Sequence, residues 1–154
     1  MVSVNKYIID TSAILSQKSD EQYRRTVYRS LWNKIDEMVQ EQEIMTCSET
    51  AAEVQDEDIK MWMVAQGMKV LPIDDDVQDN VREIVTRVNK DLVDFKSNKS
   101  SGDAFLIATA KKYGLSVITE EAINSPKKIP FTCQKMGIKC MNLLGFMEEN
   151  GMAL

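Results

Sequence analysis

The chain has 154 residues, of which 44% are hydrophobic and 28% charged, a balance that is ordinary for one soluble globular domain. It contains no histidine, which excludes Ser-His-Asp and Cys-His catalysis, histidine-based ribonuclease chemistry and most zinc sites. The net charge of −5 argues at first against a nucleic-acid partner. Any chemistry must therefore use carboxylates, lysines, hydroxyls or a bound cofactor.

The expected setting is a reduced cytoplasm. No apolar run approaches the roughly 20 residues that are needed to cross a bilayer, and no signal peptide is visible. The three cysteines leave an odd thiol and have no metal-ligand spacing. We expect a single domain over residues 1–154, with no membrane partner.

Hydrophobic periodicity predicts strands that alternate with helices along the whole chain. The clearest helix starts at Val77, where apolar residues recur at intervals of three and four. Alternation of this kind implies a mainly parallel sheet covered on both faces, a three-layer α/β/α fold. In chain order the expected elements are strand 5–10, helix 21–42, strand 43–47, helix 48–66 with Ser48 as N-cap, strand 68–73, helix 77–95, helix 103–113, strand 115–119, helix 131–136, strand 139–142 and helix 143–150.

Four carboxylates stand at the strand–helix junctions of this fold, and they are the strongest functional signal in the sequence. Asp10 ends the first strand, Glu121 comes just after strand 115–119, Glu53 lies in the first turns after strand 43–47, and Asp103 opens an apolar helix. The carboxyl ends of parallel strands meet in one crevice, so we expect these four side chains to converge. Converging acids stay ionised only beside a cation. The pattern therefore predicts a Mg²⁺ or Mn²⁺ site for phosphodiester hydrolysis.

Each acid also has a purely structural interpretation. Asp10 could bond the N–H groups of the next turn, and Asp103 could stabilise the first turn of its helix. A charge pressed against a buried helix costs several kcal/mol unless a partner offsets it, so a metal ion is the economical partner for Asp103. The run Asp74–Asp76, in contrast, is better explained as capping of the helix that follows.

Two of the assignments have a competitor close by in the sequence. Glu49 shares a predicted helix face with Glu53, and we favour Glu53 because the two alanines before it permit close packing toward the sheet. Glu120 directly precedes Glu121. Either glutamate of that second pair could instead stabilise a helix start.

Lysines gather in the part of the sequence that holds Asp103 and Glu121. Acidic residues dominate residues 1–83, whereas Lys and Arg outnumber Asp and Glu in residues 84–154. Lysines on the rim of a metal site could hold a phosphate backbone, although they could equally serve only to solvate the surface. The candidates for nucleic-acid binding are Lys96, Lys99, Lys111 and Lys127.

Several stretches resemble the motifs of the PIN-domain ribonucleases. Residues 7–15 (YIIDTSAIL) resemble the opening motif, and residues 46–54 (TCSETAAEV) are similar to the second. Residues 102–110 (GDAFLIATA), followed by residues 117–121 (VITEE), resemble the third and fourth acidic motifs. The fourth position is more often aspartate in that family, so glutamate here leaves the choice of ligand and the number of metal ions open.

The resemblance implies a five-stranded parallel sheet and a Mg²⁺- or Mn²⁺-dependent endoribonuclease. Asp10, Glu53, Asp103 and Glu121 would be the catalytic metal ligands, and Ser12 and Thr119 would be hydroxyl neighbours that orient ligands or water. Many small members are toxins of toxin–antitoxin pairs, which implies an RNA substrate and a cognate antitoxin protein and leaves a homodimer open. RNA rather than DNA follows from the resemblance alone.

Two other function classes remain to be weighed. A phosphotransfer domain of the receiver or haloacid-dehalogenase kind also places an acid after its first strand, but the Thr-Ser pair after Asp10 fits neither pattern. A non-catalytic interaction module could use Trp32, Trp62 and Met63 as anchors, although ordinary core packing explains these residues as well.

Overall fold

The computed structural model describes residues 5–88, 102–123, 125 and 128–152. Its five strands are β1 (Tyr7–Ile9), β2 (Ile44–Cys47), β3 (Val70–Leu71), β4 (Ser116–Ile118) and β5 (Cys140–Met141). They form one sheet of order β3-β2-β1-β4-β5, in which every neighbouring pair is parallel. The predicted five-stranded parallel sheet is confirmed.

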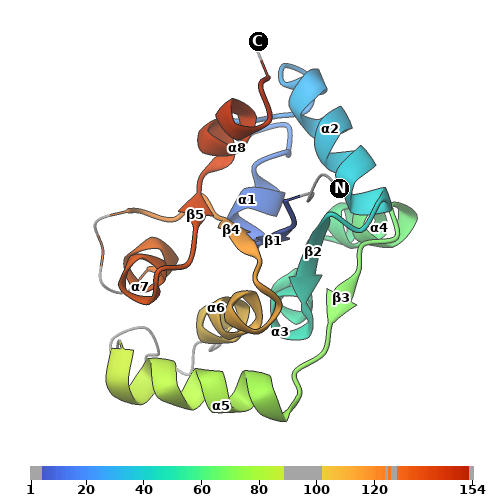
Figure 1. Cartoon of the computed structure of the whole chain (residues 1–154). Coiled ribbons are helices and arrows are strands. Elements are labelled where there is room, and N and C mark those ends of the chain that lie inside the picture. The colour runs from blue at the N-terminus through green and yellow to red at the C-terminus, as the bar shows by residue number, and fades with distance from the viewer. Residues whose placement is uncertain (1–4, 89–101, 124, 126–127, 153–154) are drawn as a thin grey trace, which may run out of the picture.

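Helices connect these strands and cover both faces of the sheet. They are α1 (Thr11–Leu15), α2 (Arg29–Gln40), α3 (Ser48–Glu53), α4 (Glu57–Ala65), α5 (Asp75–Glu83), a π-helical turn η1 (Ile84–Val88), α6 (Gly102–Tyr113), α7 (Ile129–Met136) and α8 (Leu143–Glu149). Figure 1 shows α2, α4 and α8 on one side of the sheet and α5, α6 and α7 on the other. The three-layer α/β/α fold expected from the sequence is therefore confirmed.

The central strand β1 contributes to the hydrophobic core on both faces. Tyr7 and Ile9 pack into the layer of α2, α4 and α8, whereas Ile8 packs into the layer of α5, α6 and α7. This alternation follows from the two-residue period of a strand. Since β2 and β4 flank β1, the strand order reverses at β1, and the carboxyl end of β1 is where a parallel sheet of this kind binds ligands.

The predicted helix at 21–42 starts late, at Arg29. The preceding residues form turns, and the buried Tyr23 accepts a hydrogen bond of 2.5 Å from the indole N–H of Trp32 through its backbone carbonyl. Val27, which fits the apolar stripe of the predicted helix, is 67% exposed. A tertiary contact of Tyr23 thus replaces the first turns of the helix.

The tryptophans considered as candidate anchors belong to the packed layer of α2 and α4. Trp32 is fully buried and Met63 nearly so. Trp62 packs edge-on against Trp32 and donates a hydrogen bond of 2.7 Å to Asp36. Core packing is the correct explanation for these side chains.

The predicted helix at 48–66 is two helices, α3 and α4. Asp56 separates them, because its carboxylate accepts a hydrogen bond of 3.0 Å from the Ile59 N–H and caps α4. The prediction of Ser48 as N-cap is wrong by one residue, because Cys47 is the N-cap and Ser48 is the first helical residue. Because the helix breaks before α4, Glu53 is the last residue of α3.

Other boundaries differ by a few residues. Asp74 caps α5 by accepting a hydrogen bond of 3.0 Å from the Val77 N–H, as expected for the run of three aspartates. The predicted residues 89–95 of this helix lie outside the described residues. The helix α7 begins at Ile129 with Pro130 in its first turn, where proline needs no N–H partner. Within the described ranges, every helix is too short or too polar to cross a bilayer.

Candidate active site

Asp10 lies at the carboxyl end of the central strand and is only 4% exposed. Its backbone N–H donates to the Ile118 carbonyl at 2.9 Å, so the residue continues the pairing of β1 with β4. Asp10 is the N-cap residue of α1, yet its side chain makes no capping hydrogen bond. The Asp10 carboxylate therefore does not bond the N–H groups of the next turn, which was its structural interpretation.

Two hydroxyl groups hold the Asp10 side chain instead. Ser12 donates to Asp10 Oδ2 at 2.7 Å and Thr119 donates to the same oxygen at 3.0 Å. Each hydroxyl in turn accepts a backbone N–H, Ser12 from Glu120 at 3.0 Å and Thr119 from Glu121 at 3.2 Å. The two hydroxyl oxygens lie 3.2 Å from each other. One oxygen of the Asp10 carboxylate is thus held by residues that follow two neighbouring strands.

Asp103 stands in the first turn of α6, and the pKa of its carboxyl group is strongly raised. Burial, together with the charges of Glu121, Asp10 and Glu53, raises the pKa of Asp103 to about 7, although Lys128 opposes the shift. The four predicted acids therefore act on one another, as their placement after the strands implied. A titratable group with this combination of burial and like charges is typical of a functional site.

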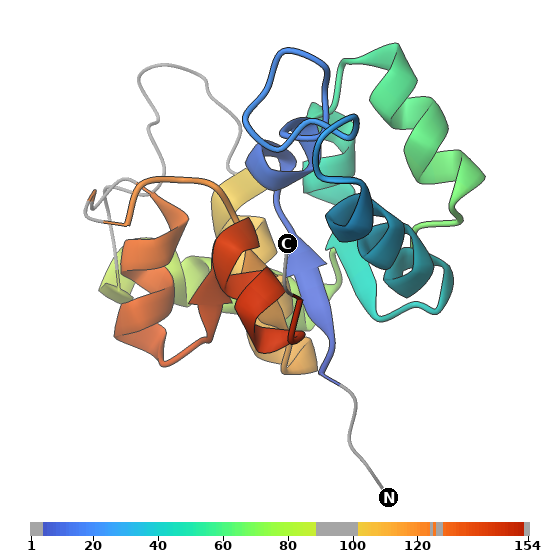
Figure 2. The same cartoon turned by 90° about the horizontal axis from the view of Figure 1, so that it is seen from above.

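Glu53 approaches the acid group through close packing of α3 against α6. A Cβ atom built on Gly102 would lie 1.8 Å from Glu53 Oε1, so the carboxylate occupies the space of the missing side chain. Of the two alanines thought to allow this approach, Ala51 packs against the core and Ala52 does not. The residue that permits the contact is thus Gly102. Figure 2 shows α1 (blue), α3 (teal) and the start of α6 (gold) gathered at one end of the molecule.

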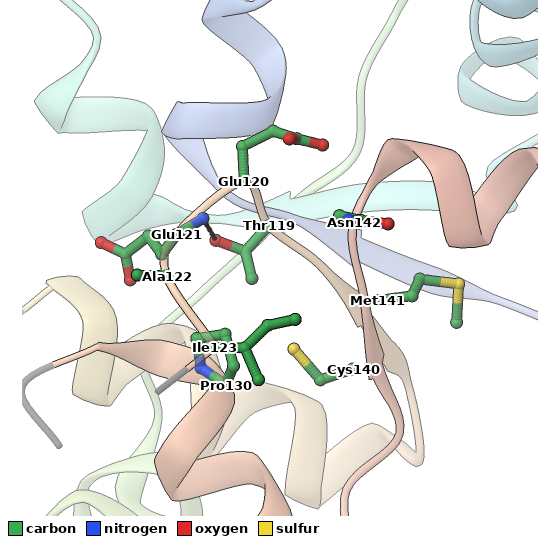
Figure 3. A pocket seen from close by; sticks show the side chains of 9 residues that line it. All are labelled: Thr119, Glu120, Glu121, Ala122, Ile123, Pro130, Cys140, Met141 and Asn142. Carbon is green, nitrogen blue, oxygen red and sulfur yellow. Dashed lines mark hydrogen bonds between the residues drawn. The ribbon is translucent and has the colours of Figure 1, made fainter. Parts of the chain in front are cut away.

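The adjacent glutamates 120 and 121 point in different directions (Figure 3). Glu120 accepts a hydrogen bond of 2.7 Å from the Leu143 N–H and so holds the start of α8. Glu121 accepts one of 3.0 Å from the Ile129 N–H at the start of α7. Burial raises the pKa of both carboxyl groups, but only that of Glu121 is also raised by Asp10 and Glu53. Glu121 is the member of the acid group, and each glutamate also stabilises a helix start.

The acids are neighbours rather than a closed coordination shell. Over residues 5–88, 102–123, 125 and 128–152, no group of three or more Asp, Glu, Cys or His side chains is arranged to hold a metal ion as it stands. Two features still suit a hard cation. The donor set consists only of carboxylate oxygens, and Gly102 provides the room that brings one of them to the others.

The structure positions one of the four candidate RNA-binding lysines. Lys111 forms an ion pair of 2.9 Å with Glu83 near the end of α6, roughly 12 Å along the helix axis from Asp103. Lys96, Lys99 and Lys127 lie outside the described residues. Among the described residues, Lys128 lies beside the acids, with its ammonium 3.8 Å from Glu121 Oε2 and its side chain 48% exposed.

A hollow of about 530 Å³ adjoins the acid group on the side of β5. Its polar wall includes Thr119 and Glu121, and its apolar wall includes Ile123, Pro130 and Cys140 (Figure 3). Sequence patterns do not indicate this hollow, because its walls come from three segments that are separated in the chain. Sequence patterns do not single out Gly102 either, although a glycine directly before an acid that opens a helix is a signal of close backbone approach.

Comparisons with known proteins agree with this architecture. The family model described as "Domain of unknown function (DUF4411)" matches residues 7–154, and no curated protein sequence matches the chain. FitAcB from Neisseria gonorrhoeae has 16% identity and a TM-score of 0.54, over 90% of this chain and 98% of that one. FitAB bound to an IR36 DNA fragment has 15% identity and a TM-score of 0.53, over 89% and 94%. PAE2754 from Pyrobaculum aerophilum has 14% identity and a TM-score of 0.50, over 96% and 90%. At these identities the likeness establishes the fold, and it confirms the PIN-like architecture.

Proposed function

This chain belongs to the DUF4411 family, a domain family of unknown function, and we propose that it is a metal-dependent endoribonuclease that hydrolyses RNA phosphodiester bonds. The observation that carries the proposal is the mutual effect of four carboxylates at the carboxyl end of the sheet. Burial and the other three acids raise the pKa of Asp103 to about 7. Ionising several buried carboxylates next to one another lowers the stability of the fold, and a bound divalent cation would offset that repulsion.

The residues that would hold the ion follow from their positions. Asp10 and Asp103 would be the principal ligands, and Glu53 and Glu121 would complete that shell or share a second ion. Mg²⁺ or Mn²⁺ held there would supply an activated water for in-line attack and stabilise the leaving oxygen. Because Asp10 Oδ2 accepts hydrogen bonds from Ser12 and Thr119, Oδ1 would be the oxygen available to the ion.

The protein's own groups orient and balance the site. Ser12 and Thr119 fix the rotamer of Asp10, and Gly102 admits Glu53. Lys128 lies at the rim beside Glu121, where an ammonium group can bind a phosphate oxygen of the substrate. Because the proposed nucleophile is a water activated by the metal ion and not the ribose 2′-hydroxyl, the products should carry 5′-phosphate and 3′-hydroxyl ends.

We extend the proposal to a biological role as the toxin of a toxin–antitoxin pair. This role rests on the resemblance of the acidic motifs to PIN-domain toxins, and it implies a cognate antitoxin protein that restrains the nuclease. Co-expression with the product of an adjacent small reading frame tests it, because that product should relieve growth inhibition and form a complex with the chain.

The decisive experiment is cleavage of mixed RNA substrates by the purified protein with Mn²⁺, with Mg²⁺ and with EDTA. Cleavage should require the metal and should disappear in Asp10→Asn and Asp103→Asn, both of which should retain the circular dichroism spectrum of the wild type. Undiminished cleavage by both variants would remove the proposal. Single-stranded and duplex DNA in the same assay determine whether RNA is preferred.

One observation favours a second candidate, a non-catalytic interaction module with the same fold. The outer face of α4 carries two strongly exposed apolar side chains, Met61 at 67% and Val64 at 82%. Isothermal titration with Mn²⁺ separates the two candidates. Absence of binding in the wild type would favour the module, whereas binding that is lost in Asp103→Asn supports the nuclease.

A further inference from the structure

Two cysteines that play no part in the proposed chemistry lie next to each other on α7 and β5. The helix α7 ends at Gly137, whose φ of +69° reverses the chain, and the Ile138 N–H donates to the Cys133 carbonyl at 2.9 Å. The chain therefore returns along the last turn of α7 directly into β5. This reversal brings Cys140 beside Cys133, although the two are seven positions apart in the sequence.

Both cysteines belong to the hydrophobic layer of α5, α6 and α7, and β5 packs directly against α7. The neighbouring Cys140 and burial raise the pKa of Cys133. A buried and protonated thiol is a poor nucleophile, so Cys140 is the cysteine that reacts first.

The two cysteines differ in access. Cys133 is fully buried, whereas Cys140 is partly exposed and lines the hollow of about 530 Å³ beside Glu121. It also lines a second hollow of about 350 Å³, which shares Ile123 and Pro130 with the first. Figure 3 shows the Cys140 sulfur directed toward Ile123 in this hollow. A small reagent can therefore reach Cys140, whereas Cys133 lies in the core that β5 covers.

We propose that Cys133 and Cys140 are a redox-active dithiol, which a low-molecular-weight disulfide converts into an intramolecular disulfide between α7 and β5. The Cys140 thiolate attacks one sulfur of the reagent, a mixed disulfide forms at Cys140, and one reagent thiolate leaves. The Cys133 thiol then loses its proton and attacks the Cys140 sulfur, which releases the second reagent thiolate. The protein is oxidised by two electrons and the reagent is reduced to two thiols.

The bond tethers two elements that form the wall of the acid site. The first N–H of α7 binds Glu121, and β5 accepts a hydrogen bond of 2.9 Å from the Thr119 N–H through the Met141 carbonyl. The third cysteine is too far from Cys140 to pair with it. Cys47 is on β2, three strand spacings or roughly 14 Å from β5, beyond the about 7 Å that a disulfide spans.

The test uses the full chain incubated with oxidised glutathione in EDTA, quenched in acid and analysed by intact mass. The wild type should lose about 2 Da, the mass of two hydrogen atoms. Trypsin cleaves after Lys135 and Lys139, which separates the two cysteines, so the disulfide should join peptides 129–135 and 140–154. The same treatment followed by dithiothreitol should restore both free thiols.

Three serine variants complete the test. Cys133→Ser should accumulate a mixed disulfide with one glutathione on Cys140, Cys140→Ser should react at least about tenfold more slowly than the wild type, and Cys47→Ser should behave as the wild type does. Wild-type protein that stops at the mixed disulfide, that forms disulfide-linked dimers, or that pairs Cys47 would overturn the proposal. These three outcomes are measured on the wild type alone, so they decide the question even if a variant fails to fold.

Discussion

The carboxylate of Glu53 occupies the volume that a side chain at Gly102 would need. A Cβ on Gly102 would come within 1.8 Å of Oε1 and 2.7 Å of the carboxyl carbon of Glu53, far inside van der Waals contact. The two residues are 49 positions apart. Glu53 is the last residue of α3, and Gly102 is the first residue of α6. The glycine is therefore a requirement of the site rather than of the fold, since α6 would begin as well with alanine.

Gly102→Ala should accordingly harm activity more than stability. The added methyl group displaces the Glu53 carboxylate from the acid group, and we expect RNA cleavage to fall by about 10- to 100-fold. The melting temperature should change little, because alanine has the higher helix propensity. Cleavage rates and thermal unfolding of the two purified proteins measure both quantities.

A double-mutant cycle provides the control for this prediction. In a Glu53→Ala background the carboxylate is gone, so adding Gly102→Ala should cost no further activity. If the two losses are simply additive, the contact between these residues does not account for the effect.

Glu120 and Glu121 form a matched pair for a second prediction. Glu121→Gln removes the charge that, after burial, contributes most to the raised pKa of Asp103, so that pKa should move toward its usual range. Cleavage should fall about 100-fold or more if Glu121 is a ligand. Glu120→Gln keeps an oxygen that accepts the Leu143 N–H and should cleave as the wild type does. Carboxyl titration by NMR and cleavage assays decide, and equal losses in the two variants would contradict the assignment of Glu121.

Sequence patterns predict the sheet and its helices well because the strands are short, buried and regular in their spacing. They miss α1, since a helix of five residues is too short to show periodicity. They also join α3 to α4, because the break contains neither glycine nor proline and depends on one capping aspartate, Asp56. The early residues of the helix predicted at 21–42 fail for another reason, the tertiary contact between Trp32 and Tyr23.

The choice between neighbouring acids could not be made from sequence. The preference for Glu53 over Glu49 relied on small neighbours, and the contact with Gly102 that favours Glu53 comes from a helix distant in the chain. Similarly, only the different hydrogen bonds of Glu120 and Glu121 separate their roles. Placement of acids after parallel strands predicts the region in which the carboxylates gather, whereas packing between distant segments determines which of them come together.

The raised pKa of Asp103 predicts how stability depends on pH in the metal-free protein. Below about pH 4 this carboxyl is protonated in both the folded and the unfolded chain, and it imposes no penalty. As the pH rises from about 4 to about 7, the unfolded chain releases the proton first, so the free energy of unfolding falls. Above about pH 7 the loss is complete, and it amounts to at most about 4 kcal/mol, less whatever solvent screens.

Asp103→Asn should remove this dependence. In EDTA the variant should unfold at higher urea concentration than the wild type at pH 8, and the two proteins should be nearly equal at pH 4. Urea titrations at both pH values give the comparison. A wild type that matches the variant at pH 8 would show that the folded protein does not hold the Asp103 proton.

The hydroxyls that hold Asp10 give the last prediction. Ser12→Ala and Thr119→Val each remove one donor to Asp10 Oδ2, and each should lower cleavage by about 10- to 100-fold, as loss of a group that orients a ligand does. Thr119→Ser keeps the hydroxyl and should restore most of the activity. Cleavage rates of the three purified variants give the comparison.

Thr11 offers a control beside the same carboxylate, because its buried hydroxyl oxygen has no hydrogen-bond partner among the described residues. Thr11→Val should therefore leave cleavage unchanged and raise the free energy of unfolding by about 1 kcal/mol, since the buried hydroxyl is lost without breaking a bond. Equal losses of cleavage in Thr11→Val and Thr119→Val would mean that the activity depends on packing around Asp10 rather than on the two hydrogen bonds that orient it.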